Sequence, residues 1–251
     1  AASIGWLHGR RAGASGVVPI GASARHWEIT KWILQFGKRR SVVMHARGIQ
    51  PPAALDDMSF VLRGAGHFET GCRPCHGAPG DPMPRIPLAM TPQPPELQSR
   101  LENWSAAQLF YIVKHGIKFT GMPAWPAQRR DDEVWAVVAF LRRLPSLDRT
   151  AYESIVRGGG TELPEMSGTS MAAPPGVVTT TCARCHGVDG LGGGAFPKLA
   201  GQRAQYMRGA MQAYAASTRH SGIMEPVAAG LSPAAIEEGV RYYAALGAER
   251  G

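Results

Sequence analysis

Apolar residues recur along several segments of this chain at the spacing of one face of an α-helix. The clearest stripe lies in a helix predicted to begin at Asp131, with apolar side chains at i, i+3, i+4 and i+7: Val134, Val137, Val138 and Leu141. The same spacing occurs near the N-terminus in Ile29, Trp32, Ile33 and Phe36. Stripes of this kind are typical of helices that bury one side. The pattern predicts an all-α fold.

Capping residues indicate where further helices begin. Asp56 or Asp57 precedes a helix that leads toward the first cysteine of the chain. Ser105 is followed three residues later by Gln108, the pattern of a capping box, which predicts a helix through about residue 114. Near the C-terminus, Ser232 and the proline after it predict the start of the last helix. The order of helices and loops thus occurs twice along the chain.

This repetition predicts two small domains. The chain has 251 residues, more than one typical domain of about 100–150 residues. Residues 55–148 and 176–251 are each interpreted as a helical domain. Gly, Pro, Ser and Thr are frequent between them, so residues 149–175 are interpreted as a linker. Residues 1–54 are an N-terminal extension outside both domains.

Positive charge is concentrated in this extension. The chain has 27 Lys and Arg against 19 Asp and Glu, for a net charge of +8. Residues 1–54 contain eight basic residues and one acid, whereas residues 55–150 contain eleven and ten and residues 151–251 contain eight and eight. Neither domain therefore has the basic composition of a nucleic-acid-binding domain, and we expect no nucleic-acid partner.

The cysteines carry the strongest chemical signal. They form two identical pairs, Cys72/Cys75 and Cys182/Cys185, and none is left over. A histidine follows each pair at once, His76 in C-R-P-C-H and His186 in C-A-R-C-H. In this motif the two thiols attach one haem covalently and the imidazole ligates its iron. The sequence predicts two haem c groups.

Two other interpretations of a C-x-x-C pair fit less well. A zinc ribbon would place its second pair about 15–20 residues after the first, but here more than a hundred residues separate Cys75 from Cys182. A thioredoxin-like dithiol does not require a histidine directly after its second cysteine. Because the histidine occurs in both motifs, haem is favoured at both.

A methionine in each domain is the candidate sixth ligand of the iron. In the first domain this is Met122 in T-G-M-P-A-W, in a loop between two predicted helices; Met90 and His115 are the rivals. In the second domain it is Met224 in S-G-I-M-E-P, just before the last helix. The alternatives there are Met207, Met211 and His220. Met/His ligation is typical of electron-transfer cytochromes rather than of open catalytic haems.

The C-x-x-C-H motifs, the T-G-M-P-A-W loop and the apolar terminal helix resemble class I cytochrome c. Their tandem arrangement over about residues 55–251 resembles bacterial di-haem cytochromes c. The resemblance implies an all-α domain wrapped round each covalent haem. It also implies that a proline carbonyl accepts a hydrogen bond from each ligand histidine, which indicates Pro197 in F-P-K-L and Pro95 in P-P-E-L.

The N-terminal extension requires a separate interpretation. Its apolar stripe is accompanied by Lys31, Gln35 and Lys38 on another side, and Lys38-Arg39-Arg40 ends this basic amphipathic segment. Such stripes usually pack on the rest of a globular protein, so packing on a haem domain is the favoured expectation. The alternative is that residues 26–40 contact an anionic membrane surface or a partner protein.

The predicted function is single-electron transfer in a bacterial respiratory chain, by a carrier rather than an enzyme. The expected partners are a redox protein or a membrane complex: an oxidase, a quinol-oxidising complex or a dehydrogenase. The alternatives are a di-haem enzyme of the peroxidase type, which needs one iron open to substrate, and an electron-transfer subunit of a periplasmic dehydrogenase.

The haem prediction also sets the expected compartment, because thioether-bound haem belongs to the periplasmic side of the bacterial cytoplasmic membrane. The chain contains no run of 18 or more apolar residues. Its first residue is alanine, which is compatible with an export signal or a membrane anchor ahead of this segment. We therefore expect a periplasmic protein with the option of an N-terminal membrane anchor.

Overall fold

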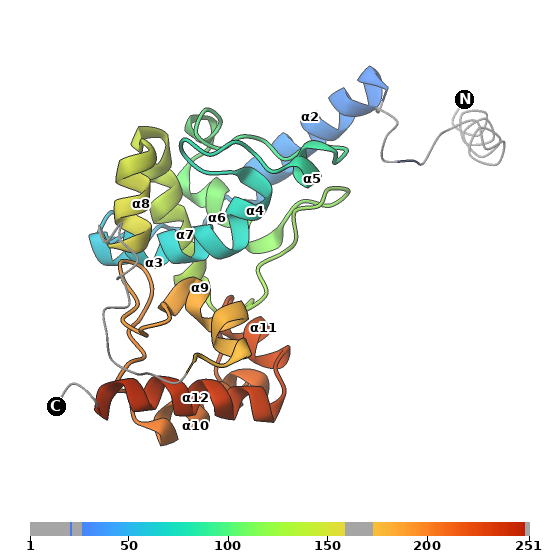
Figure 1. The fold of residues 1–251 in the computed structure, drawn as a ribbon. Coiled ribbons are helices and arrows are strands. Elements are labelled where there is room, and N and C mark those ends of the chain that lie inside the picture. The colour runs from blue at the N-terminus through green and yellow to red at the C-terminus, as the bar shows by residue number, and fades with distance from the viewer. Residues whose placement is uncertain (1–20, 22–26, 159–172, 249–251) are drawn as a thin grey trace.

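The protein folds into two helical bodies with an extended helix at one end (Figure 1). The computed structural model describes residue 21, residues 27–158 and residues 173–248. The remaining residues, which include about half of the predicted linker and about half of the N-terminal extension, lie outside the described part. Within the described ranges the elements are helices and turns, with no strand. The all-α prediction is confirmed.

The first domain is organised by the crossing of two helices, α3 (Met58–His67) and α7 (Asp131–Arg143). The helices approach closely at Gly64, where an added Cβ would lie 1.9 Å from the Ala136 carbonyl oxygen. The predicted stripe of α7 is buried here: Val134, Val137, Val138 and Leu141 are at most 4% exposed. Periodicity therefore identified a buried face of α7. The contact with Gly64 of α3 is made by Ala136 and Phe140 on the other side of the helix, which is also buried.

The other elements of this domain surround the crossing. A π-helical turn η1 (Phe68–Cys72) continues α3 into the short helix α4 (Arg73–His76), and α5 (Arg85–Leu88) lies in the proline-rich loop that follows. The 3₁₀ turn η2 (Leu101–Asn103) precedes α6 (Ala106–His115), and the 3₁₀ turn η3 (Leu144–Ser146) follows α7. The predicted capping box opens α6, with Ser105 and Gln108 bonded reciprocally at 3.0 and 3.3 Å.

One helix of this domain was not expected. Residues 149–157, predicted as the start of the linker, form α8 (Arg149–Arg157), which packs against α3. Its Tyr152 and Val156 are buried in the core of the first domain. Asp148 caps the helix by accepting a hydrogen bond from the Ala151 amide at 2.7 Å. The first domain thus extends to about residue 157, because these two apolar side chains complete its core.

The second domain is smaller and repeats the arrangement in shortened form. The π-helical turn η4 (Val178–Cys182) leads into α9 (Ala183–His186), and α10 (Ala204–Ala215), α11 (Met224–Ala229) and α12 (Pro233–Ala248) follow. Its core consists of Val178, Ala200, Met207, Val240, Tyr243 and Leu246. The described residues contain no counterpart of α3 ahead of η4.

The helix α2 (Glu28–His45) projects away from both domains (Figure 1). Only its last turns contact the first domain, where Val42 is buried and His45 stacks on Tyr111 of α6. The predicted apolar stripe is exposed: Ile29 60%, Trp32 61%, Ile33 54% and Phe36 55%. The expectation that this stripe packs on a haem domain is wrong, because the stripe lies in the part of the helix that extends beyond the domain.

Candidate haem sites

The first C-x-x-C-H motif lies where η1 passes into α4. Within a helix, residues three and four apart are neighbours on one face, so Cys72, Cys75 and His76 share one side of this turn. Gly77 ends the turn with φ +70°, a conformation in which glycine is favoured. The chain then turns back at once. This local fold can present two sulfurs and one imidazole to a single ligand.

His76 is fixed by a backbone carbonyl. Its Nδ1 lies 2.8 Å from the Pro95 oxygen, and because a carbonyl only accepts, Nδ1 carries the proton. Burial lowers the pKa of His76, and this hydrogen bond opposes the shift. The imidazole is therefore neutral at neutral pH with the Nε2 lone pair free, the form in which histidine binds metal. Pro95 is the residue that the family resemblance implied for this contact.

A cavity of about 280 Å³ adjoins His76. It is lined mainly by apolar or small side chains of η1, the proline-rich loop and η3, among them Phe68, Pro79, Met83, Leu97 and Leu144. An apolar recess beside a neutral imidazole suits part of a flat, largely apolar macrocycle.

The loop that carries Met122 is closed by its own hydrogen bonds. The Ile117 amide donates to the Met122 carbonyl at 3.2 Å, and Thr120 Oγ1 accepts from the Met122 amide at 3.1 Å. Trp125 then anchors the end of the loop to α6 by donating its amide to the Lys114 carbonyl at 3.0 Å. The half-buried Met122 side chain thus stands on a well-defined loop.

The two rivals of Met122 are placed differently. Met90 reaches the same loop, because a Cβ added at Gly121 would lie 2.0 Å from the Met90 methyl carbon. His115 is exposed at the end of α6 and packs on Tyr111, with ring centroids 4.7 Å apart. His115 is therefore on the outer surface of α6, whereas Met90 and Met122 lie at the same end of the domain.

The second motif repeats the first. Its Cys182 ends η4, Cys185 and His186 lie on α9, and Gly187 ends the turn with φ +78°. The Nδ1 atom of the buried His186 lies 2.8 Å from the Pro197 oxygen. Burial lowers the pKa of His186 and the carbonyl opposes the shift, as for the first histidine. Both motifs thus hold the imidazole in the same tautomer by a proline carbonyl.

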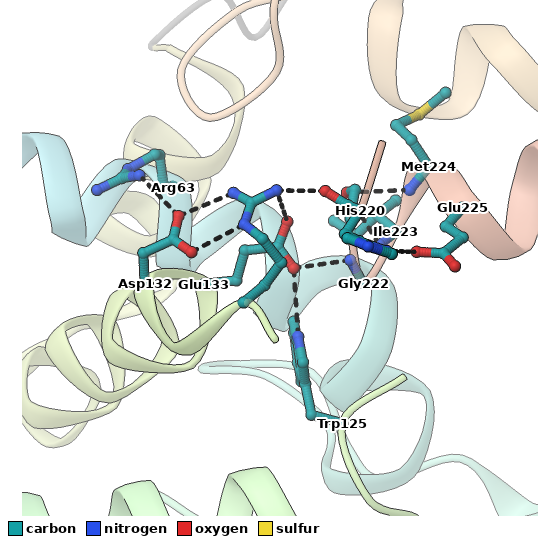
Figure 2. A network of polar contacts seen from close by, with 11 residues as sticks. Arg63, Trp125, Asp132, Glu133, His220, Gly222, Ile223, Met224 and Glu225 are labelled. Atoms are coloured by element: carbon teal, nitrogen blue, oxygen red, sulfur yellow. Dashed lines mark hydrogen bonds and ion pairs between the residues drawn. The ribbon is translucent and has the colours of Figure 1, made fainter. Parts of the chain in front are cut away.

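Met224 begins α11. Ser221 Oγ accepts hydrogen bonds from the Ile223 and Met224 amides at 3.3 and 3.2 Å, which fixes the turn. The Met224 side chain points away from the polar network that lies behind it (Figure 2). Among the alternatives, Met207 is buried in the domain core and His220 faces Glu225 at 3.4 Å.

Three of the four cysteines lie in surroundings that disfavour the thiolate. Burial raises the pKa of Cys72 to about 12 and also raises the pKa values of Cys182 and Cys185. Zinc requires thiolates, and no cluster of three or more His, Cys, Asp or Glu in the described ranges could hold a metal ion. The donor set of each motif, two half-buried cysteines and one neutral imidazole, fits covalent haem instead.

Some contacts around the haem sites cannot be predicted from the sequence. Arg73, inside the first motif, pairs with Glu69 and with Asp81 at 2.7 Å, and the Tyr152 hydroxyl from α8 also donates to Glu69. These contacts brace the attachment turn from three directions. They join residues up to 83 positions apart, which spacing along the chain cannot reveal.

Two family models match the chain. The model described as cytochrome C oxidase, cbb3-type, subunit III matches residues 60–141, and the model described as cytochrome c matches residues 175–241. Each match includes one C-x-x-C-H motif. No solved structure matches.

Several curated proteins are similar. A thiosulfate dehydrogenase electron acceptor of Stutzerimonas stutzeri is 28% identical over 79% of this chain and 89% of its own length. A cytochrome c-552 of Acidithiobacillus ferridurans is 26% identical over 70% of this chain and 73% of its own length. A cytochrome c-554(548) of Halomonas halodenitrificans is 40% identical over 25% of this chain and 81% of its own length.

These relatives are named as electron acceptors or cytochromes, that is, as electron carriers rather than enzymes. The two family models cover one cytochrome domain each, and the two cysteine pairs supply one covalent haem each. The chain belongs to the cytochrome c family, as a bacterial di-haem cytochrome c that carries two covalent haem c groups and transfers electrons.

Proposed function

We propose that His76 and Met122 ligate the iron of the first haem, and that His186 and Met224 ligate the second. When bound, haem supplies a one-electron couple between ferric and ferrous iron. The paired contacts of His76 with Pro95 and of His186 with Pro197, each at 2.8 Å, are the observation that carries this proposal. They orient each imidazole and leave its Nε2 free.

Methionine at the sixth position determines what such a site does. A thioether closes the iron to substrates and raises its reduction potential, which suits electron transfer. A peroxidase would need one open iron, but each domain carries a half-buried methionine on a fixed turn. The cysteines Cys72, Cys75, Cys182 and Cys185 form the thioether bonds in this proposal.

We further propose that the chain accepts electrons from a periplasmic dehydrogenase and delivers them to a membrane respiratory complex. The first domain matches a model of an oxidase subunit, and one relative is named as the electron acceptor of thiosulfate dehydrogenase. Both names describe proteins that transfer electrons. The periplasmic location is proposed because domains that carry covalent haem c are typically exported to that compartment.

Electron uptake from a dehydrogenase can be tested directly. The ferric protein, mixed with a bacterial thiosulfate dehydrogenase and thiosulfate, should become reduced at both haems. Joining two thiosulfates into tetrathionate releases two electrons, one for each haem. Stopped-flow absorbance measures the rate, and the mixture without thiosulfate is the control. Absence of reduction, while a dye acceptor is reduced by the same enzyme, would exclude this class of donor.

We propose that α2 is the membrane-contacting element. The part of it that extends beyond the first domain carries exposed Trp32, Ile33 and Phe36 together with exposed Lys38 and Arg40. A basic helix with an unburied apolar stripe is typical of helices that lie in the surface of an anionic bilayer. None of the described helices has the length and apolarity to span a bilayer.

Removing two charges from α2 should weaken vesicle binding. Each Lys or Arg near an anionic surface contributes about 1 kcal/mol, so Lys38→Gln with Arg40→Gln should weaken binding about 30-fold. Arg39 is retained because its guanidinium lies over Trp104 of the first domain, 5.6 Å from the ring centroid. Flotation with anionic vesicles at low salt measures the effect.

The matched control removes the same charge elsewhere. Arg157→Gln with Arg241→Gln changes two exposed residues on α8 and α12 and should leave vesicle binding within about twofold. If both double variants lose binding equally, net charge rather than α2 drives the contact. If neither loses binding, α2 is not the membrane element.

A further inference from the structure

One buried carboxylate lies at the contact between the two domains. Glu133 lies on α7 with its side chain 6% exposed. Its Oε2 atom accepts a hydrogen bond from Trp125 Nε1 at 3.2 Å and another from the Gly222 amide at 2.7 Å (Figure 2). Trp125 belongs to the first domain and Gly222 to the second. One buried oxygen atom thus bonds to both domains. Elsewhere the domains meet where the Ala195 amide donates to the Val156 carbonyl at 3.4 Å and where Ala195 and Phe196 pack on the first core.

The two donors are placed next to the proposed sixth ligands. Trp125 follows Met122 by three residues, at the end of the same loop. Gly222 precedes Met224 by two residues, in the turn that Ser221 fixes. The oxygen of Glu133 therefore lies between the two methionine loops, at hydrogen-bonding distance from both.

The contact is closely packed. A Cβ added at Gly222 would lie 2.5 Å from Trp125 Cζ2, so the indole and the second loop touch at a position where only glycine leaves enough room. On its other side the indole meets the buried His67 edge to face, with ring centroids 5.2 Å apart. The indole is thus held between α3 and the second domain.

An arginine supports the carboxylate. Arg130 Nη1 lies 3.2 Å from Glu133 Oε1, and the same group donates to the His220 carbonyl of the second domain. The remaining donors of Arg130 bind Asp132 at 2.8 Å, and Arg63 pairs with Asp132 at 3.7 Å (Figure 2). Glu133 is therefore a buried charge with a paired cation and satisfied oxygens, which keeps it in one geometry.

We propose that Glu133 is a positioning residue that locks the two sixth-ligand loops, and with them the two haems, in one fixed relation. This inference rests on the proposed ligation by Met122 and Met224. A change on the first-domain side of the lock should then alter the haem of the second domain. Electron transfer between the two haems moves one electron from a ferrous to a ferric iron. A fixed geometry keeps the rate of this transfer the same from one turnover to the next.

The test is whether a substitution in the first domain changes the haem of the second domain. Trp125→Phe removes one donor while keeping an aromatic ring, and Glu133→Leu removes the acceptor. Both holoproteins should show a shifted reduction potential for the second haem. In Glu133→Leu the Gly222 amide should exchange its hydrogen about tenfold faster, as expected when one hydrogen bond is lost. Hydrogen exchange by NMR and redox titration are the measurements.

Glu237→Gln is the matched control, because it breaks a bidentate pair with Arg208 (2.7 and 2.8 Å) inside the second domain. It should change neither the Gly222 exchange rate nor the potentials. The proposal is overturned if Trp125→Phe and Glu133→Leu leave the second potential and Gly222 exchange at their wild-type values. If Glu133→Leu does not fold, the same two measurements on Glu133→Gln and Trp125→Phe distinguish these outcomes.

Failure of the proposed methionine ligation can be distinguished from failure of the Glu133 proposal. The red charge-transfer band of methionine-ligated ferric haem counts the methionine ligands in the wild type. If that band is missing for the second haem, Met224 is not its ligand. The Gly222 exchange rate still reports on the lock, since the Gly222 amide donates to Glu133 whichever residue ligates the iron.

Discussion

Met122→His is expected to lower the reduction potential of one haem by on the order of 0.2 V, about a quarter of the roughly 0.8 V range that axial ligands span. Imidazole favours the ferric state more than a thioether does, so the first haem becomes harder to reduce. The second step of the redox titration should stay in place, because the substitution leaves Trp125 and Glu133 unaltered.

The rival methionine supplies the control. Met90→Leu keeps the apolar packing against Gly121 and removes only the second sulfur near the loop. Its titration should match that of the wild type. If Met90→Leu lowers the first potential and Met122→His does not, Met90 is the sixth ligand and the T-G-M-P-A-W loop has another role.

Gly64→Ala is expected to destabilise the first domain by more than about 3 kcal/mol, beyond the usual cost of overpacking. The added Cβ would lie 1.9 Å from the Ala136 carbonyl oxygen and 2.9 Å from Phe140 Cβ. Neither neighbour can move as a flexible side chain, so α3 and α7 must separate along their crossing. Denaturant unfolding, followed by tryptophan fluorescence and haem absorbance, measures the loss.

The matched substitution is Gly209→Ala on α10. A Cβ there meets nothing within 4 Å, so the change should stabilise the helix by about 0.5–1 kcal/mol, the usual difference between Ala and Gly. Opposite signs for the two substitutions would show that the cost at Gly64 comes from the helix crossing. Equal, small effects would mean that α3 and α7 are not in close contact at Gly64.

The sequence determined the features whose residues are contiguous. The haem motifs are of this kind, since two sulfurs and an imidazole that share one helical turn must be three and four residues apart. The capping box of Ser105 and Gln108 and the buried stripe of α7 are equally local. Such features follow from helical geometry, and no tertiary information is needed to find them.

Which segments belong to which of the two bodies could not be read from the sequence and follows from the fold. Residues 149–157 belong to the segment interpreted as a linker, yet Tyr152 and Val156 fill the first core. The apolar stripe of α2 has the spacing of a packed helix, yet it stays exposed. Periodicity states that a face is apolar, but what covers that face depends on how far the helix extends beyond its last contact.

The contacts of the sites with distant residues were also decided by the fold. The carbonyls of Pro95 and Pro197 are backbone atoms, and every residue has one, so their orientation toward a histidine depends on the course of the loop. In the sequence, Glu133 is one of three acidic residues in the first turn of α7, and nothing distinguishes it from the other two. Its bond to Gly222 spans 89 residues and two domains. It exists only because folding brings the two methionine loops to one buried oxygen.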